Sequence, residues 1–525
     1  MWFSLSGVII SSLVPNVFTQ KATDPIVDTG YAKYLGNRTF PNTVAFLGIP
    51  YAEPPLGERR FRAPLPLDTV RVSLEASGAV INATFYPAFC IQGTTGDGDA
   101  GGAGSEDCLK VNIYTPADAK NGSNLPVLVY IHGGGYTFGN PANWPFDHWI
   151  RQSPNVVIVS VYYRLSSFGF LALPEFEDSQ LGDFNAGFLD QTEALRWVKS
   201  HIASFGGNPD KVTINGESAG GSSVELHLIA NKDNELFTGA IAQSVFRTPL
   251  PTPEQQEPLF QFYAQHAGVS ALARAQDAGS SSAFTGSPYK TFHPVLDGKI
   301  FTEFPTQSIT SGKFASVPLI VGSSATTNET LTGGNTIAAA LISYCPLLTT
   351  ADIVVLEEAY PESDFADDLR MQTLTGDVSV RCARTIMATN FSYNVPAWTY
   401  RYNQRNPTLP PSLGVAHAAE NWMMFLGTNT GVNGTTTFTP MTPIENAFAS
   451  ELIAYWLSFV RSGNPNTYRL SGSPIWPSYS VEERPRIVLQ QAATLTASGS
   501  FVEEEVEPET HRCELIASQA TDQQN

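Results

Sequence analysis

The chain has 525 residues and a net charge of −19, because 49 acidic residues outnumber 30 basic ones. Nucleic acids and anionic membranes are polyanions, so this charge opposes both as partners. The length suffices for a large buried core, and no Gly/Ser-rich or charged linker interrupts it, so we expect a single domain over residues 20–500.

An apolar stretch near the N-terminus runs from Val8 to Val17. It is too short to span a bilayer and polar sequence follows it, which is typical of a secretory signal peptide. We therefore expect residues 1–19 to be a signal peptide, the protein to be secreted and extracellular, and no stable membrane insertion. Six N-x-[ST] sequons fit a secreted glycoprotein, at Asn37, Asn82, Asn121, Asn328, Asn390 and Asn433.

The first motif with chemical meaning is an apolar run, Leu125–Ile131, that leads into His132 and then three glycines. Glycines let the main chain turn several N–H groups toward one point, as the stabilisation of an oxyanion requires. A Gly-rich run can also hold a phosphate, but neither G-K-[ST] nor G-x-G-x-x-G is present here. A strand followed by HGGG is typical of the oxyanion loop of esterases and lipases.

Apolar residues at spacings of three and four predict a helix from Phe184 to Phe205, ended by Gly206 and Gly207.

A β-branched run, residues 212–214, then leads into the pentapeptide 216–220, which reads Gly-Glu-Ser-Ala-Gly, and an amphipathic stretch begins near Ser222. The pattern G-x-S-x-G between a strand and a helix is a nucleophile elbow, in which glycine lets the two elements approach closely. Chance alone gives such a pentapeptide in roughly one chain in four of this glycine content. The flanking strand and helix favour Ser218 as a nucleophile.

Residues 317–324 form the next predicted strand, and catalytic groups of parallel sheets lie beyond the carboxyl ends of strands. The first carboxylate after this strand is Glu329, which we expect to be the acid of a triad. The alternative for Glu329 is a solvated loop acid. Asp297 comes earlier and fits better as a turn residue before Gly298.

The base follows from chain order, because the elbow fold supplies its triad as Ser, then Asp or Glu, then His. Of eight histidines, only His417 and His511 lie far enough downstream. His511 belongs to residues 501–525, which we expect to form an acidic, flexible tail. His417 precedes an aromatic and Met-rich segment that can wall an apolar pocket, so we expect it to be the base.

Ordered motifs from about Phe46 to Pro477 resemble those of the type-B carboxylesterases, the cholinesterase-like branch of the α/β-hydrolases that includes many secreted fungal esterases and lipases. They are FLGIPYAEPPLGERRF, SEDCLKVNIYTP, VLVYIHGGGYTFG, VYYRLSSFGFLA, NAGFLDQTEALRWVKSHIASFGGNPDKVTINGESAGG, AYWLSFVRSGNPN and IWPSYS. The resemblance implies an α/β-hydrolase fold, with a large, mostly parallel central sheet flanked by helices and a small N-terminal antiparallel sheet.

The resemblance also implies roles for single residues. It makes Ser218 the nucleophile, Glu329 the triad acid and His417 the base. It places beside them an oxyanion hole and two supporting side chains, with Gly134, Gly135 and Ala219 in the hole and Glu217 and Ser244 next to the triad.

Five cysteines leave at least one unpaired. The resemblance implies a Cys90–Cys108 disulfide. Among the other three, a Cys345–Cys382 pair with Cys513 free is one arrangement, and the sequence leaves the alternatives open. No Cys/His cluster has metal-ligand spacing, so we expect no metal and no cofactor.

The loop between Cys90 and Cys108 bears on the substrate, because related lipases use it as an amphipathic lid and cholinesterases place a choline-binding tryptophan in it. Here its only large apolar residue is Ile91 and it has no tryptophan. A lid without an apolar face gains nothing at an oil surface, and a choline site would lack its ring.

We therefore predict a secreted serine carboxylesterase that hydrolyses small, soluble carboxylic esters through an acyl-enzyme. The alternatives are a lipase, a specialised secondary-metabolite ester hydrolase, or a catalytically silent adhesion or binding member of the same family.

Overall fold

A computed structural model describes most of the chain. The described ranges are 25–92, 104–233, 235–267, 289–324, 336–365, 369–430, 436–495 and 497–525. The expected signal peptide, residues 1–19, and the expected acid, Glu329, lie outside them.

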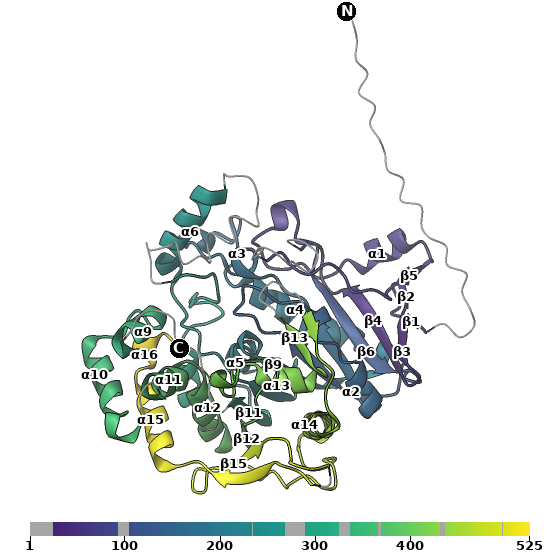
Figure 1. Ribbon diagram of the computed structural model, residues 1–525. Coiled ribbons are helices and arrows are strands. Elements are labelled where there is room, and N and C mark those ends of the chain that lie inside the picture. Colours follow the sequence, from purple (N-terminus) through teal and green to yellow (C-terminus); the bar gives the residue numbers. More distant parts are fainter. Residues whose placement is uncertain are drawn as a thin grey trace, which may run out of the picture.

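The fold is built on an 11-stranded sheet whose strand order is β16-β15-β12-β11-β10-β9-β7-β8-β6-β4-β3 (Figure 1). Neighbouring strands from β8 to β15 are parallel, and the pairs outside this run are antiparallel. This confirms the expected large, mostly parallel sheet. Its strands are β3 (Asn37–Phe40), β4 (Thr43–Pro50), β6 (Lys110–Pro116), β7 (Leu125–Ile131), β8 (Val157–Val161), β9 (Gly207–Glu217), β10 (Gly239–Gln243), β11 (Leu319–Ser324), β12 (Ala397–Tyr402), β15 (Pro485–Leu489) and β16 (Phe501–Glu504).

Two smaller sheets accompany it. The N-terminal one contains β1 (Ile26–Asp28), β2 (Lys33–Leu35) and β5 (Val80–Asn82). This sheet was expected to be antiparallel, but only its β1–β2 pair is antiparallel. The β2–β5 pair is parallel, because the long connection between these strands, which contains helix α1 (Thr69–Ala76), brings the chain back in the same direction. A hairpin of β13 (Thr428–Thr430) and β14 (Thr436–Phe438) forms the other.

Helices cover both faces of the central sheet. They are α1 (Thr69–Ala76), α2 (Asp147–Gln152), α3 (Ser166–Phe170), α4 (Ala186–His201), α5 (Ala219–Ala230), α6 (Pro253–Ala267), α8 (Pro305–Thr310), α9 (Ile337–Tyr344), α10 (Thr350–Glu358), α11 (Leu369–Gly376), α12 (Cys382–Ser392), α13 (Ala419–Met424), α14 (Pro443–Ser462), α15 (Glu507–Ser518) and α16 (Ala520–Gln523). In the parts of the chain described, no helix is both long and apolar enough to cross a membrane.

Strand β7 shows how the sheet separates two cores. Val127, Val129 and Ile131 pack into one buried cluster, and Leu128 and Tyr130 pack into the other. Alternation along a strand sends successive side chains to opposite faces, so a strand covered on both sides is apolar throughout. Helices α4, α5 and α12 contribute to the first cluster, and α2, α13 and α14 to the second.

The two helices expected around the elbow are both present. The run from Phe184 to Phe205 contains α4 and a short 3₁₀ turn, and Gly206 ends it at φ 89°. Helix α5 begins at Ala219 rather than near Ser222, and it is buried on all sides instead of amphipathic. It has no solvent-facing side because the sheet and other helices enclose it.

The C-terminal segment corrects the prediction of a flexible tail. Residues 501–525 form β16, α15 and α16 and pack beside α10 and α12 (Figure 1). Glu503, Glu505 and Glu509, which make the segment acidic, pair with arginines of the domain. Charges that suggested solvation in the sequence are therefore what holds the segment in place.

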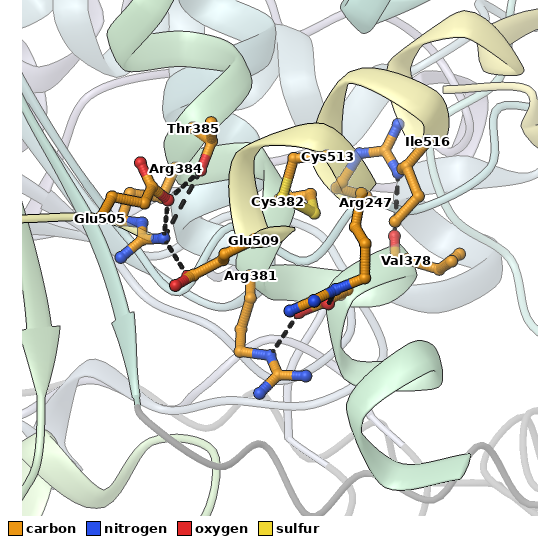
Figure 2. The surroundings of a disulfide bond; sticks show 12 residues. Arg247, Val378, Arg381, Cys382, Arg384, Thr385, Glu505, Glu509, Cys513 and Ile516 are labelled. Carbon is orange, nitrogen blue, oxygen red and sulfur yellow. Dashed lines mark hydrogen bonds and ion pairs between the residues drawn. A yellow bond between two sulfur atoms is a disulfide. The ribbon is translucent and has the colours of Figure 1, made fainter. Parts of the chain in front are cut away.

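The disulfides also correct one expectation. Cys90–Cys108 is present, as the resemblance implies. The second disulfide joins Cys382 of α12 to Cys513 of α15, and Cys345 is a buried free thiol, so the arrangement with a Cys345–Cys382 pair is wrong (Figure 2). In the chain-entropy account, closing a loop of 131 residues stabilises the fold by about 5 kcal/mol.

We expect one thiol per chain, detectable only after unfolding. Burial raises the pKa of Cys345 to about 12, so the reactive thiolate is scarce at neutral pH and is shielded from reagent. A thiol-reactive chromophore should titrate no thiol in the native protein and one in guanidinium without reductant. In Cys345→Ser that thiol should disappear. Peptide mapping that locates it at Cys513 instead would contradict the pairing.

Candidate active site

Ser218 lies at the sharp turn between β9 and α5, with φ 59° and ψ −124°. Non-glycine residues rarely adopt this conformation, and strain of this kind is concentrated at functional sites. The glycines on either side are required by close contacts. A Cβ on Gly216 would lie 2.3 Å from the Gly220 carbonyl oxygen, and one on Gly220 would lie 2.0 Å from that of Ile131.

The structure brings His417 to this serine. His417 lies in the loop between β12 and α13, and its Nε2 is 2.7 Å from Ser218 Oγ in a hydrogen bond. Two hydrogen bonds fix the end of α13, because His148 Nε2 and Trp149 Nε1 both donate to the Met424 carbonyl, at 2.7 and 3.1 Å. This arrangement allows the imidazole to accept the serine proton.

Glu329 lies outside the described residues, but the structure does place Asp297, which was weighed against it, and Asp352, a further carboxylate downstream. Asp297 Oδ1 accepts from the backbone N–H groups of Lys299, Ile300 and Phe301, so it is the expected turn residue. Asp352 caps the start of α10 by accepting from Thr349. Both are engaged in local structure. The strand that precedes Glu329, β11, ends at Ser324 as expected.

Two further carboxylates are buried around the serine and histidine. Glu217 Oε1 lies 3.5 Å from His417 Nε2, and its Oε2 accepts from Asn421 Nδ2 at 3.0 Å. Ser244 Oγ donates to Glu420 Oε1 at 3.1 Å. Burial raises the pKa of Glu420, and the nearby His417 and the Ser244 hydroxyl partly offset this.

Sequence reasoning missed Glu420 and Asn421. Their signal is positional, because they follow His417 by three and four residues, in the first turn of the helix that begins at Ala419. Of the two supporting side chains that the resemblance implies, Glu217 lies beside His417, and Ser244 bonds to Glu420.

The loop after β7 reaches the same point. Gly134 has φ 111° and Gly135 has φ 61°, and a Cβ on Gly134 would lie 2.1 Å from the Phe138 carbonyl oxygen. His132 is buried against the rings of Trp144 and Tyr163, and burial lowers its pKa to about 4, so it is a neutral structural residue. Ala219, the third expected donor of an oxyanion hole, directly follows Ser218 as the first residue of α5.

A cavity of about 680 Å³ opens over these residues. Its lining includes an aromatic group of side chains and a polar group. The aromatic wall consists of Phe138, Trp144, Phe246 and Trp422, and the polar wall of Asn406, Thr408, Thr428, Asn429, Thr437 and Thr439.

The polar wall was not anticipated. Asn406 Nδ2 donates to Asn429 Oδ1, Asn429 Nδ2 donates to Thr408 Oγ1, and Thr408 Oγ1 donates to Asn406 Oδ1, at 2.7 to 2.8 Å. This closed ring joins the loop after β12 to the β13–β14 hairpin. Over the described ranges, no group of three or more His, Cys, Asp or Glu side chains could hold a metal ion.

Comparisons with known proteins agree along nearly the whole chain. The sequence model of the carboxylesterase family matches residues 23–340 and 354–513. Acylcarnitine hydrolase of Mus musculus is 32% identical over 486 residues, covering 84% of this chain and 82% of the relative. Para-nitrobenzyl esterase of Bacillus subtilis is 31% identical over 502 residues, covering 90% and 96%.

Among solved structures, Aspergillus niger EstA superposes with a TM-score of 0.82 at 29% identity, covering 96% of this chain and 99% of that one. The match confirms the predicted α/β-hydrolase fold.

Proposed function

Because the chain belongs to the carboxylesterase family and is a carboxylic ester hydrolase, we propose that Ser218, His417 and Glu329 are the triad with which it hydrolyses esters through an acyl-enzyme. The observation that carries this proposal is the 2.7 Å hydrogen bond between Ser218 Oγ and His417 Nε2, at a strained turn that lines the cavity of about 680 Å³. It joins a nucleophile to its base across 199 positions of the chain.

The first half of the reaction forms the acyl-enzyme. Ser218 Oγ attacks the ester carbonyl carbon while His417 Nε2 takes its proton, and the carbonyl oxygen becomes an oxyanion. The backbone N–H groups of Gly134, Gly135 and Ala219 donate to that oxyanion, and each such donor is worth about 3 kcal/mol in the transition state. The tetrahedral intermediate then collapses, and the imidazolium returns the proton to the departing alcohol.

The second half repeats these steps with water. His417 takes a proton from the water that attacks the acyl carbon, and it then protonates Ser218 Oγ as the carboxylic acid leaves. In our proposal Glu329 holds the imidazole and stabilises its positive charge. The Glu217 carboxylate, 3.5 Å from Nε2 and oriented by Asn421, adds negative charge beside the imidazolium.

The lining of the cavity supports small esters with a polar portion as substrates. An acyl or alcohol group of modest size can pack against Phe246 and Trp422, while the Asn406 and Asn429 amides offer hydrogen bonds. We also propose secretion, which the two disulfides support because such bonds persist in oxidising compartments. The alternative of a silent adhesion protein is disfavoured, since the serine–histidine pair is intact.

Ser218→Ala should abolish ester hydrolysis and covalent labelling by an organophosphonate while leaving the fold intact. The reason is that no other hydroxyl replaces the attacking oxygen. Activity on p-nitrophenyl butyrate, labelling and circular dichroism would be measured together, with Ser363→Ala, an exposed serine, as the matched control. A folded mutant that still labels would remove Ser218 from the mechanism.

Glu329→Gln should lower turnover by roughly 10³-fold or more, since a neutral amide cannot stabilise the imidazolium. Asp352→Asn serves as the control, because Asp352 caps a helix, and it should retain turnover. The measurement is kcat from steady-state kinetics, compared between the variants and the wild type at equal amounts of folded protein. Near-normal turnover in Glu329→Gln would place the triad acid elsewhere.

The ratio kcat/KM should fall for long acyl chains, and activity should not jump when a substrate exceeds its solubility. A long chain in this cavity would meet the polar side chains of Asn406, Thr408 and Asn429, which an aliphatic chain cannot hydrogen-bond. A series of p-nitrophenyl esters from acetate to palmitate, assayed below and above each solubility limit, measures both. Activation at the solubility limit would favour the lipase alternative.

A further inference from the structure

A second cavity, of about 180 Å³, lies where the C-terminal segment packs against the sheet. Its wall is unusual for a buried site in an acidic protein, because five arginines line it. These are Arg381, Arg384, Arg401, Arg486 and Arg512, together with Asp377, Glu509, Ser323 and Ser324. No residue of this wall lines the cavity over Ser218.

Several elements meet at this cavity. Strand β11 supplies Ser323 and Ser324 at its carboxyl end, and β12 and β15 supply one arginine each. The other residues of the wall come from α12, from α15 and from the turn between α11 and α12. The Cys382–Cys513 disulfide joins α12 to α15 (Figure 2). The wall is therefore rigidly held rather than assembled from loose surface arginines.

The carboxylates around the cavity do not balance its arginines. Asp377 is shared by Arg381 and Arg512, at 2.8 and 3.3 Å. Glu509 is shared by Arg384 and Arg486, at 2.6 and 2.8 Å.

Two carboxylates behind the wall complete the network. Glu503 bonds both Arg401 and Arg486, at 2.8 and 2.6 Å, and Glu505 bonds Arg384. Four carboxylates thus face five guanidinium groups, so one positive charge of this cluster is not neutralised by a carboxylate.

We propose that this cavity binds a small inorganic oxyanion of the phosphate or sulfate type. Such an ion supplies negative charge where one is lacking, and guanidinium groups pair with it in bidentate fashion. The volume equals that of about six waters in the liquid, enough for one tetrahedral anion and a few waters. Water alone would leave the surplus positive charge without a counter-charge.

The test is a titration of the full chain with sodium sulfate and with sodium phosphate, at an ionic strength held constant with sodium chloride. Binding is measured by isothermal titration calorimetry and by the shift in melting temperature. Sodium acetate is a third arm, which asks whether a planar carboxylate binds as well. We expect saturable binding of one sulfate or phosphate per chain, weaker binding of acetate and none of chloride. Sulfate also stabilises proteins by exclusion from their surfaces, but that effect does not saturate.

Two variants locate the binding. Arg401→Gln removes a cavity arginine while leaving Glu503 paired with Arg486, and it should weaken the anion at least about tenfold. Arg484→Gln removes an arginine that pairs with Glu507 and does not line the cavity, and it should bind as wild type does. Arg512→Gln is a second cavity variant in case the first does not fold.

Two results would overturn the proposal. Absence of saturable binding to the wild-type chain overturns the proposal whatever the variants do. Saturable binding that survives in both Arg401→Gln and Arg512→Gln also overturns it, because the ion would then lie elsewhere.

Discussion

The close approach of three backbone segments at the elbow is the constraint on which the site depends. Gly220, on the first turn of α5, packs directly on the Ile131 carbonyl at the end of β7, with no room for even a methyl group. That contact fixes the position of the loop that follows Ile131 relative to Ser218. The nucleophile and the glycine loop are therefore aligned by main-chain packing, before any side chain of the site takes part.

Parallel strands make the rest of the site possible. Strands β7, β9, β11 and β12 all end at the same edge of the sheet, so the segments that follow them converge although they are far apart in sequence. The strained backbone of Ser218 is tolerated because the sheet beneath it is buried on both faces.

What the sequence predicted well were features with local signals. The strand–HGGG junction, the elbow and the helix from Phe184 to Phe205 each depend on residues close in the chain. Chain order predicted His417 as the base, and the structure places it at Ser218. Glu329 lies outside the described residues, so its role as the acid stays a prediction. The errors about the C-terminal segment and the second disulfide involve partners over 100 residues apart. Arg384 meets Glu505 and Cys382 meets Cys513, so segment 501–525 seemed to lack anything to bury against.

The Cys382–Cys513 bond also has a consequence for biosynthesis. A ribosome adds about 5–20 residues per second, so Cys382 emerges roughly 7–26 s before Cys513, which lies 131 positions later. During that interval the nearer thiol in sequence is Cys345, and Arg384 of α12 still lacks its partners Glu505 and Glu509. The second disulfide and the ion pairs of Arg384 thus form only after residue 513 has been added, so oxidation that runs ahead of synthesis has the wrong cysteine within reach.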